Sequence, residues 1–310
     1  MASKELILGL REYELKDIVS SGKVLGIGTY CCVSEVLLGE TVCVAKTMHP
    51  ELVDFNVGVD AFIEECRIIS KLQHPNIVTF IGLHWPAKTG DDDKVETPWI
   101  ILEYLSTDLS HFLNRAVIKP TSVKVSILLD VSKGLLYLHN YPGHFCEYIV
   151  HCDLSSFNVL LNDSLTAKIC DFGKSLVVTS TKTEQVVDCG AYFFMPPEAN
   201  VFGSSVLCSP TLDVFSYGVI ILHTITETLP GSLALHTFQD SNGKTQTNTS
   251  IEQRAKYYGM VDQSLDPSIR LLNDLSKHCL NDDPKQRPTT NELVCVLEKL
   301  KDSLEMDELN

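Results

Sequence analysis

The sequence predicts an α+β protein with two lobes: a small antiparallel β-sheet lobe with one helix, followed by a larger, mainly helical lobe. Strand-like segments dominate up to residue 104, and helical spacing of apolar residues dominates from residue 108 onward. Glu103-Tyr104-Leu105 joins the two parts. We therefore expect a small lobe over residues 20–104 and a large lobe over residues 105–301, with residues 1–19 and 302–310 as flanking segments.

The small lobe is predicted from its strand signals. Three strand segments surround a glycine turn, and Gly39-Glu40 forms the hairpin between the last two: Val24–Leu25, Val33–Leu38 and Thr41–Thr47. Residues 59–73 predict a helix, because apolar side chains recur on one face: Phe62, Cys66, Ile69 and Leu72. Two more strands are expected at Ile77–Leu83 and Trp99–Tyr104, separated by a charged, solvated loop over residues 88–94.

The large lobe is predicted from helical periodicity. Its clearest helix is Val125–His139, where leucine and valine recur at helical spacing: Leu128, Val131, Leu135 and Leu138. Three short apolar strands follow at Tyr148–Val150, Val159–Leu161 and Ala167–Cys170. The polar residues 240–251 predict a flexible loop, and we expect the acidic end after residue 301 to fray.

Composition excludes several classes of protein. A net charge of −15 over 310 residues disfavours a surface for nucleic acid or for an anionic membrane, since both attract basic patches. The apolar runs are too short to span a bilayer, so we expect no membrane insertion. Eleven cysteines, an odd number without a CxxC pair, indicate reduced thiols rather than disulfides or zinc. With no signal-peptide pattern at the start, we expect a cytoplasmic protein.

Two acids and an amide on predicted turns carry the chemistry. Asp153 and Asn158 lie five residues apart between two apolar strands, and Asp171 follows the next strand. An isolated acid at a loop corner is usually a turn former. Together, however, these groups supply a residue to orient a hydroxyl and two oxygen ligands for Mg²⁺, which is what phosphoryl transfer needs.

The motif order resembles the catalytic core of eukaryotic protein kinases over roughly residues 20–300. The quoted segments are His151-Cys152-Asp153-Leu154-Ser155-Ser156-Phe157-Asn158, Asp171-Phe172-Gly173, Met195-Pro196-Pro197-Glu198-Ala199 and Asp213-Val214-Phe215-Ser216-Tyr217-Gly218. The segments at 154–158 and 194–198 resemble the tyrosine-kinase-like Ser/Thr group. The resemblance implies that Asp213 ties down the catalytic loop and that Glu198 pairs with Arg287.

The resemblance also implies an ATP site, with most of its positions in the small lobe and with Leu105 and Leu160 in the large lobe. Gly26-Ile27-Gly28 is weak by itself, because such spacing also suits an ordinary hairpin, but here it resembles the glycine-rich loop over phosphates. Lys46 would clamp the phosphates and Glu65 would hold Lys46; Glu64 is the neighbouring alternative. The positions implied to bind the nucleotide are Gly26, Gly28, Val33, Val44, Lys46, Leu102, Glu103, Leu105 and Leu160.

Besides Cys31, which replaces the third glycine of the glycine-rich loop, four positions depart from the family pattern. Cys152 stands where most members have an Arg that receives an activation-segment phosphate. Ser155 replaces the Lys of Ser/Thr kinases, Phe157 the Arg of tyrosine kinases, and Ala191 the Thr that would orient that Lys. By analogy with the loss of one preorganised donor, such a change lowers the rate by about 10²–10³-fold.

The expected function is an ATP-dependent protein kinase. It would transfer the γ-phosphoryl group of Mg-ATP, or of the Mn²⁺ complex, to a protein hydroxyl, with Ser/Thr preferred over Tyr. Asp153, Lys46 and Glu65 are the expected catalytic residues, and Asn158 and Asp171 the expected metal ligands. The alternative is a pseudokinase that acts as a nucleotide-binding scaffold or allosteric partner, and the four departures motivate it. The substrate would be a protein, with basic peptides favoured by charge alone.

Overall fold

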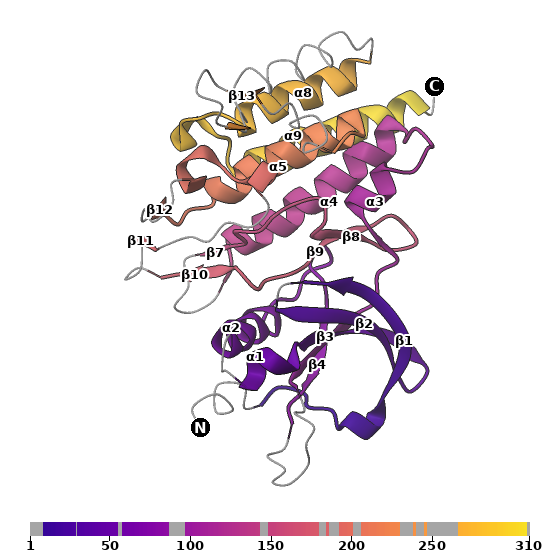
Figure 1. The fold of residues 1–310 in the computed structure, drawn as a ribbon. Coiled ribbons are helices and arrows are strands. Elements are labelled where there is room, and N and C mark those ends of the chain that lie inside the picture. Colours follow the sequence, from indigo (N-terminus) through magenta and orange to yellow (C-terminus); the bar gives the residue numbers. More distant parts are fainter. Residues whose placement is uncertain are drawn as a thin grey trace. The chain divides into compact units, whose positions relative to one another are not determined.

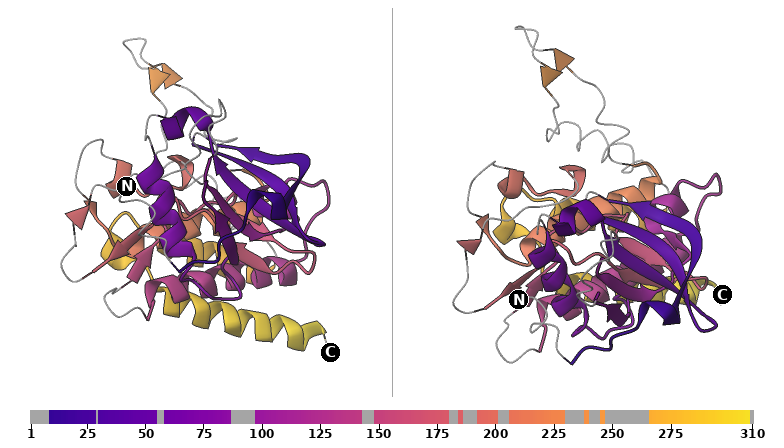
Figure 2. Two further views of the ribbon diagram at one scale, coloured as in Figure 1. Left: turned by 90° about the horizontal axis from the view of Figure 1, so that it is seen from below. Right: turned by 60° about the horizontal axis from the view of Figure 1, so that its bottom comes forward.

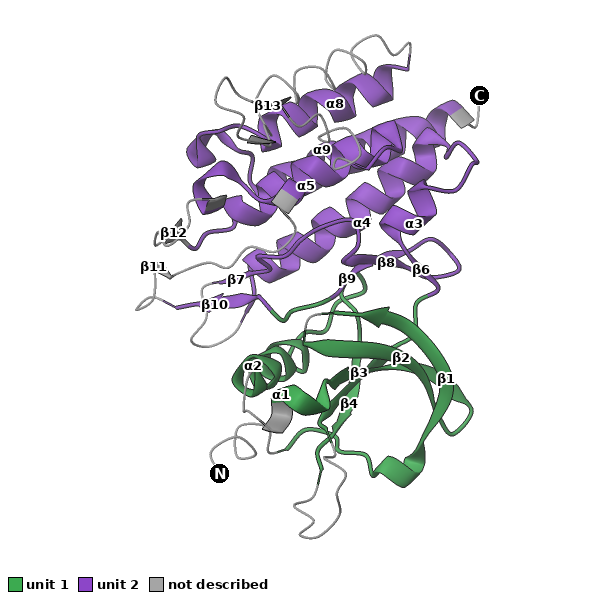
Figure 3. Cartoon of the chain, in the orientation of Figure 1, with its two compact units in different colours: residues 1–105, 171–173 green, residues 106–170, 174–310 purple. Residues whose placement is uncertain are grey.

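The computed structural model of the chain confirms the α+β class. It describes residues 9–28, 30–54, 58–86, 97–142, 148–179, 184–185, 192–200, 206–229, 238–239, 245–246 and 266–308. The chain divides into two compact units, residues 1–105 with 171–173 and residues 106–170 with 174–310 (Figure 3). The units differ from the predicted lobes in that the first takes in the N-terminal segment and Asp171–Gly173.

The first unit is built on a five-stranded antiparallel sheet in the order β1-β2-β3-β5-β4 (Figure 1). Its strands are β1 (Ile18–Ile27), β2 (Cys31–Leu38), β3 (Thr41–Met48), β4 (Phe80–His84) and β5 (Trp99–Glu103). The unit also contains a short 3₁₀ turn, η2 (Leu15–Asp17), the predicted helix α2 (Val59–Ile69) and a five-residue helix α1 (Pro50–Asp54) that the sequence did not predict. Strand β4 is shorter than the expected strand and begins later in the sequence. The residues before it form a turn, in which Ile77 N–H donates to the His74 carbonyl, instead of pairing in the sheet.

Both faces of this sheet are covered by apolar side chains, as alternation along a strand requires. One cluster joins the sheet to α2 and contains Cys31, Met48, Phe62, Ile63, Cys66, Leu83 and Ile100. The other face carries Ile18, Val36, Cys43, Ala45 and Ile101. Residues 11–13 add to the edge strand, since Tyr13 N–H donates to the Leu83 carbonyl and Leu83 N–H to the Arg11 carbonyl. The expected loop at 88–94 lies outside the described residues.

The second unit is mainly helical. Its helices are α3 (Leu109–Leu113), α4 (Thr121–His139), α5 (Thr211–Thr226), α8 (Pro267–Cys279) and α9 (Thr290–Glu308), with 3₁₀ turns η3 (Tyr192–Phe194), η4 (Pro197–Asn200) and η5 (Pro284–Gln286). Short strands pair as β6 (Thr107–Asp108), β8 (Val159–Leu161) and β9 (Ala167–Ile169); β7 (Tyr148–Val150) with β10 (Leu176–Val178); β11 (Glu184–Gln185) with β12 (Val206–Leu207); and β13 (Phe238–Gln239) with β14 (Thr245–Gln246). Apart from β14, the predicted loop at 240–251 lies outside the described residues.

Helix α5 is the centre of this unit, buried on all sides as an almost wholly apolar helix must be. Helix α8 packs on it where Gly218 lacks a side chain: a Cβ there would lie 2.6 Å from the Cys279 Cβ. Helix α9 packs along α4, and the left view of Figure 2 shows the yellow α9 running to the C-terminal end of the chain. The expectation that residues after 301 fray was wrong. They continue α9 to Glu308, because Leu297 and Leu300 anchor this helix in the core.

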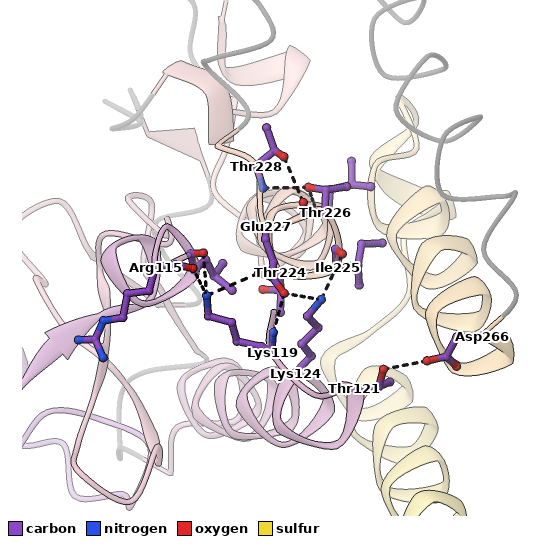
Figure 4. A network of polar contacts seen from close by, with 12 residues as sticks. Arg115, Lys119, Thr121, Lys124, Thr224, Ile225, Thr226, Glu227, Thr228 and Asp266 are labelled. Atoms are coloured by element: carbon purple, nitrogen blue, oxygen red, sulfur yellow. Dashed lines mark hydrogen bonds and ion pairs between the residues drawn. The ribbon is translucent and has the colours of Figure 1, made fainter. Parts of the chain in front are cut away.

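A buried ionic cluster ties α3, α4 and α5 together. Figure 4 shows Lys119 and Lys124 pointing toward Glu227, whose carboxylate lies 2.8 Å from Lys124 Nζ and accepts the Lys119 N–H at 3.0 Å. Burial raises the pKa of Glu227, but these donors outweigh it and the pKa is lowered. Glu227 has φ of 52°, a left-handed conformation that favours glycine, so the lysines hold a strained residue in place.

The described cysteines are all free thiols, and six of the nine are buried. Within the described part of the chain, no helix has the length and apolarity needed to cross a membrane.

Candidate active site

Lys46 is the centre of an ionic cluster in the first unit. Its Nζ lies 2.7 and 2.8 Å from the two oxygens of Glu65 and 2.8 Å from Asp171 Oδ1. Strand β3 presents Lys46 on the sheet face that packs on α2, and Glu65 lies in the buried stripe of α2 beside Phe62 and Cys66. The register therefore falls on Glu65; Glu64 is bonded instead to Arg67 at 2.8 Å.

Electrostatics keep this lysine charged. Burial lowers the pKa of Lys46, but the carboxylates of Glu65 and Asp171 outweigh it and raise the pKa above its ordinary value. The three N–H donors of the ammonium thus match three carboxylate oxygens. Two carboxylates and one ammonium leave a formal charge of −1 on the cluster, and the Asp171 side chain is 43% exposed, so a cation is attracted to its side.

Asp171 is held in an unusual backbone conformation. Its φ is 64°, and Gly173 N–H donates to Asp171 Oδ1 at 3.4 Å. A Cβ on Gly173 would lie 3.4 Å from an oxygen of Asp171 and from one of Glu65. The glycine therefore leaves room for both carboxylates. A non-glycine residue with positive φ costs about 1 kcal/mol or more, and such residues concentrate at functional sites.

The sheet beside Lys46 presents a half-buried apolar face. Val33 pairs with Lys46 across β2 and β3, and Val44 pairs with Leu102 across β3 and β5. Because directly opposed residues, and residues two apart on one strand, share a face, these four side chains lie together. Val33, Val44 and Leu102 form an apolar surface next to the buried ammonium of Lys46. Such a surface suits a ligand with a flat apolar part and a charged part.

The glycine turn closes this end of the sheet. Gly26 pairs with Val33, and Gly28 N–H donates to the Cys31 carbonyl at 2.8 Å. Around Gly26 a Cβ would meet nothing within 4 Å. Cys31, which replaces the third glycine of the family pattern, turns its side chain into the core cluster with Met48 and Phe62. Burial raises the pKa of this thiol to about 11, so it remains a neutral packing group.

In the segment 103–105, which begins at the last residue of β5, the Glu103 side chain is used for structure. Glu103 Oε1 accepts hydrogen bonds from both the N–H and the hydroxyl of Thr79, each at 2.6 Å. Leu105 is buried. The backbone of this segment is therefore the part suited to recognise a ligand.

In the second unit, the loop 151–158 is anchored by Asp213. Its carboxylate accepts the N–H groups of His151 and Cys152 at 2.8 and 3.0 Å, as the sequence predicted. It also bonds His139 Nε2 at 2.9 Å, a contact that sequence reasoning missed because the two residues lie 74 apart on different helices. His151 is fully buried and its Nε2 donates to the Cys170 carbonyl, so it is a packing residue.

Asp153 and Asn158 are held together by this loop. Asn158 Nδ2 donates to the Asp153 carbonyl at 2.8 Å, and Asn158 N–H donates to the Ser155 carbonyl at 3.0 Å. Both side chains are half-buried. Since the Asn158 nitrogen is engaged, its Oδ1 is the atom that it presents to a cation. Leu160, two residues on, lies half-buried on β8.

The departures from the family pattern have distinct environments. Cys152 lies in an apolar cluster with Val150, Val178, Cys208 and Leu212, and its φ is 63°. Ser155 is only 2% exposed, whereas Phe157 is 46% exposed. Ala191 lies outside the described residues.

The predicted Glu198–Arg287 ion pair is present. The two side chains form a bidentate pair at 2.6 and 2.8 Å, and the Arg287 side chain is fully buried. Arg287 also donates to the carbonyls of Asn281 and Thr211, so four of its five N–H donors are used for structure.

Comparison with known proteins matches this arrangement to one family. The family model described as "Protein kinase domain" matches residues 19–296. The Arabidopsis thaliana "Serine/threonine/tyrosine-protein kinase HT1" is 31% identical, over 77% of this chain and 54% of that protein. The "Probable serine/threonine-protein kinase kinY" of Dictyostelium discoideum is 25% identical, over 93% of this chain and 48% of that protein. "Protein BRASSINOSTEROID INSENSITIVE 1" of Arabidopsis thaliana is 28% identical, over 90% and 23%. The chain thus spans about half the length, or less, of these relatives.

Proposed function

Because this chain belongs to the protein kinase family, we propose that it transfers the γ-phosphoryl group of ATP to a protein hydroxyl, with Ser/Thr preferred over Tyr. The observation that carries the proposal is the cluster of Lys46, Glu65 and Asp171, in which a buried ammonium is kept charged beside an exposed carboxylate. The name of the Dictyostelium relative describes a serine/threonine kinase, which supports the preference for Ser/Thr, whereas the name of HT1 includes tyrosine as well.

The residues that would bind the nucleotide belong to the first unit, except Leu160, which belongs to the second. The face made by Val33, Val44 and Leu102 would take the adenine, with the backbone at Glu103 and Leu105 on its edge and Leu160 as a further contact. Gly26 and Gly28 would let the backbone approach the phosphates. A phosphate oxygen would then replace Asp171 as the third acceptor on Lys46, while Glu65 keeps the other two donors and the position of the ammonium.

The residues of the second unit would act on the hydroxyl. Asp153 would orient it and take its proton late in the transfer. Two contacts support this role: Asp213 fixes the backbone at His151 and Cys152, and Asn158 fixes the Asp153 carbonyl. With the backbone held on both sides of Asp153, its carboxylate needs little reorganisation before reaction.

Mg²⁺, or Mn²⁺ in its place, would be held by Asn158 and Asp171. The donor set fits, since an amide oxygen and an exposed carboxylate are hard oxygen ligands. No group of three or more His, Cys, Asp or Glu within the described residues could hold a metal alone. Mg²⁺ is commonly bound by one or two protein ligands plus substrate phosphates, and when bound it neutralises the phosphate charge.

The test is phosphate transfer to Ser/Thr and Tyr peptides, with Asp153→Asn, Asp171→Ala and Lys46→Met as variants. We expect Asp153→Asn to lower the turnover number by about 10²-fold or more while Mg-ATP still raises the melting temperature. His111→Ala is the control, because His111 is exposed on α3 and pairs only locally with Asp108. Equal phosphate incorporation by wild type and Asp153→Asn contradicts the assigned base.

The second candidate function is a pseudokinase scaffold that binds nucleotide without transfer. The observation that favours it is Ser155, which is buried at the position where a Lys would meet the transferring phosphate. In this case Mg-ATP stabilises wild type but not Lys46→Met, and wild type transfers no more phosphate than Asp153→Asn. The free thiols of the described cysteines support the cytosol as the compartment for either function.

A further inference from the structure

His49 makes two hydrogen bonds to the glycine turn. It directly follows β3, three residues after Lys46. Its N–H donates to the Tyr30 carbonyl at 3.0 Å, and its ring Nε2 lies 3.0 Å from the Gly28 carbonyl oxygen. Because a carbonyl only accepts, the ring donates through Nε2–H. The strand that carries the ammonium therefore also holds the turn.

The turn needs such a restraint. Gly26 and Gly28 lack side chains, and glycine loses more conformational freedom on ordering than any other residue. A Cβ on Gly26 would meet nothing within 4 Å, and on Gly28 its nearest neighbour would be the Cys31 carbonyl oxygen at 3.5 Å. Within the described part of the turn, the Gly28–Cys31 hydrogen bond closes it on itself, and the His49 bonds attach it to the sheet.

A second contact links the turn to α2. The Tyr30 ring lies 3.5 Å from where a Cβ of Gly58 would be, and Gly58 is the N-cap residue directly before α2, with φ of 78°. Helix α2 carries Glu65. His49 is also joined to the short helix α1, because Leu52 N–H donates to the His49 carbonyl. His49 thus lies at the junction of the turn, the lysine strand and the segment that leads to the glutamate helix.

We propose that His49 is a positioning residue, which holds the glycine turn in the arrangement that receives the phosphates of ATP. The inference rests on the proposed nucleotide binding and adds a residue that the family motifs do not include. The His49 ring acts through its hydrogen bond to the Gly28 carbonyl. Because His49 fixes the turn before ATP binds, less conformational entropy is lost when the turn is ordered around the phosphates, and ATP binds more tightly.

The expected change in affinity follows from the loss of one exposed hydrogen bond, worth about 1 kcal/mol, which corresponds to about a fivefold change. His49→Ala should weaken Mg-ATP binding by about that factor. His49→Gln should restore most of it, since the glutamine amide can donate from nearly the same position. Adenosine, which has no phosphates, should bind all three proteins equally.

The experiment measures the affinities of Mg-ATP and adenosine by competition against a fluorescent nucleotide, for wild type, His49→Ala, His49→Gln and the control His111→Ala. An ATP-specific loss in His49→Ala with recovery in His49→Gln supports the proposal. Equal ATP affinity of His49→Ala and wild type overturns it, as does an equal loss for ATP and adenosine, which would indicate a general effect on the fold. Failure of wild type to bind Mg-ATP overturns the proposed function itself and this inference with it.

Discussion

At the scale of single residues, Cys152 shows how a departure from the family pattern is accommodated. The side chain at this position is 6% exposed and lies among Val150, Val178, Cys208 and Leu212. An arginine that receives a phosphate needs a polar, accessible environment. Here the loop is instead joined to α5 by apolar packing and by the two N–H groups that Asp213 accepts. The cluster and the cysteine are therefore matched to each other.

We predict that Cys152→Arg, although it restores the common residue of the family, destabilises the fold by about 3 kcal/mol or more. A guanidinium forced into this cluster would be a buried charge without a partner. The measurement is the free energy of unfolding by urea. Cys295→Arg is the matched control, because Cys295 is exposed on α9 and should change stability by about 0.5 kcal/mol or less. Wild-type stability in Cys152→Arg would show that the apolar cluster is not what sets this position.

At the scale of secondary-structure elements, the lysine cluster in the second unit determines how α5 ends. The helix stops at Thr226, and Glu227 takes the left-handed conformation in which glycine usually ends helices. Lys119 Nζ also donates to the carbonyls of Leu113 and Arg115, at 3.0 and 2.7 Å, so it caps α3 as well. One carboxylate and two buried lysines thus hold the ends of α3 and α5 to the start of α4 (Figure 4).

We predict that Glu227→Gly destabilises the protein by about 2 kcal/mol, although it relieves about 1 kcal/mol of backbone strain. The loss arises because Lys119 and Lys124 lose the carboxylate that neutralises them. Adding Lys124→Met should recover about 1 kcal/mol, since one buried ammonium is then removed. Urea unfolding of both variants and of Lys124→Met alone gives the coupling energy. A stabilising effect of Glu227→Gly alone would mean that strain outweighs the ion pairs.

At the scale of the whole molecule, the net charge of −15 favours basic protein substrates in this proposed kinase. The local arrangement adds to this, because the cluster around Lys46 is itself net negative. Long-range attraction between charges is screened within about 10 Å at 0.1 M salt. It therefore acts mainly on the encounter with substrate rather than on the transfer step.

We predict that raising the salt concentration from about 0.05 to 0.3 M increases KM for a basic acceptor peptide about threefold. A neutral peptide with the same acceptor residue should change little, and the turnover number of both should stay nearly constant. Steady-state kinetics with the two peptides provides the measurement. The same salt dependence for both peptides would rule out charge as the basis of substrate preference.

The sequence by itself determined what depends on short spacings. The apolar periods of β2, β3, α2 and α4, the order of strand-rich and helical parts, and the acids and amide on turns, Asp153, Asn158 and Asp171, were readable, because period and turn chemistry are local properties of the chain. The role of Lys46 came from the family resemblance. The long-range pairs Lys46–Glu65, Glu198–Arg287 and Asp213 with the catalytic loop were predicted only because the family resemblance supplied them.

The tertiary structure alone decided the rest. Several contacts join residues whose spacing in the sequence has no period. They are the ion pair of Asp171 with Lys46, 125 residues away, the contact of His139 with Asp213, the packing around Cys152 and the hydrogen bond of His49 to Gly28. The same applies to α9. The sequence alone predicts a frayed acidic end, whereas in the structure the burial of Leu297 and Leu300 in the core anchors the helix. Such contacts form because packing brings distant segments together, and a buried polar group must then find a partner where the fold provides one.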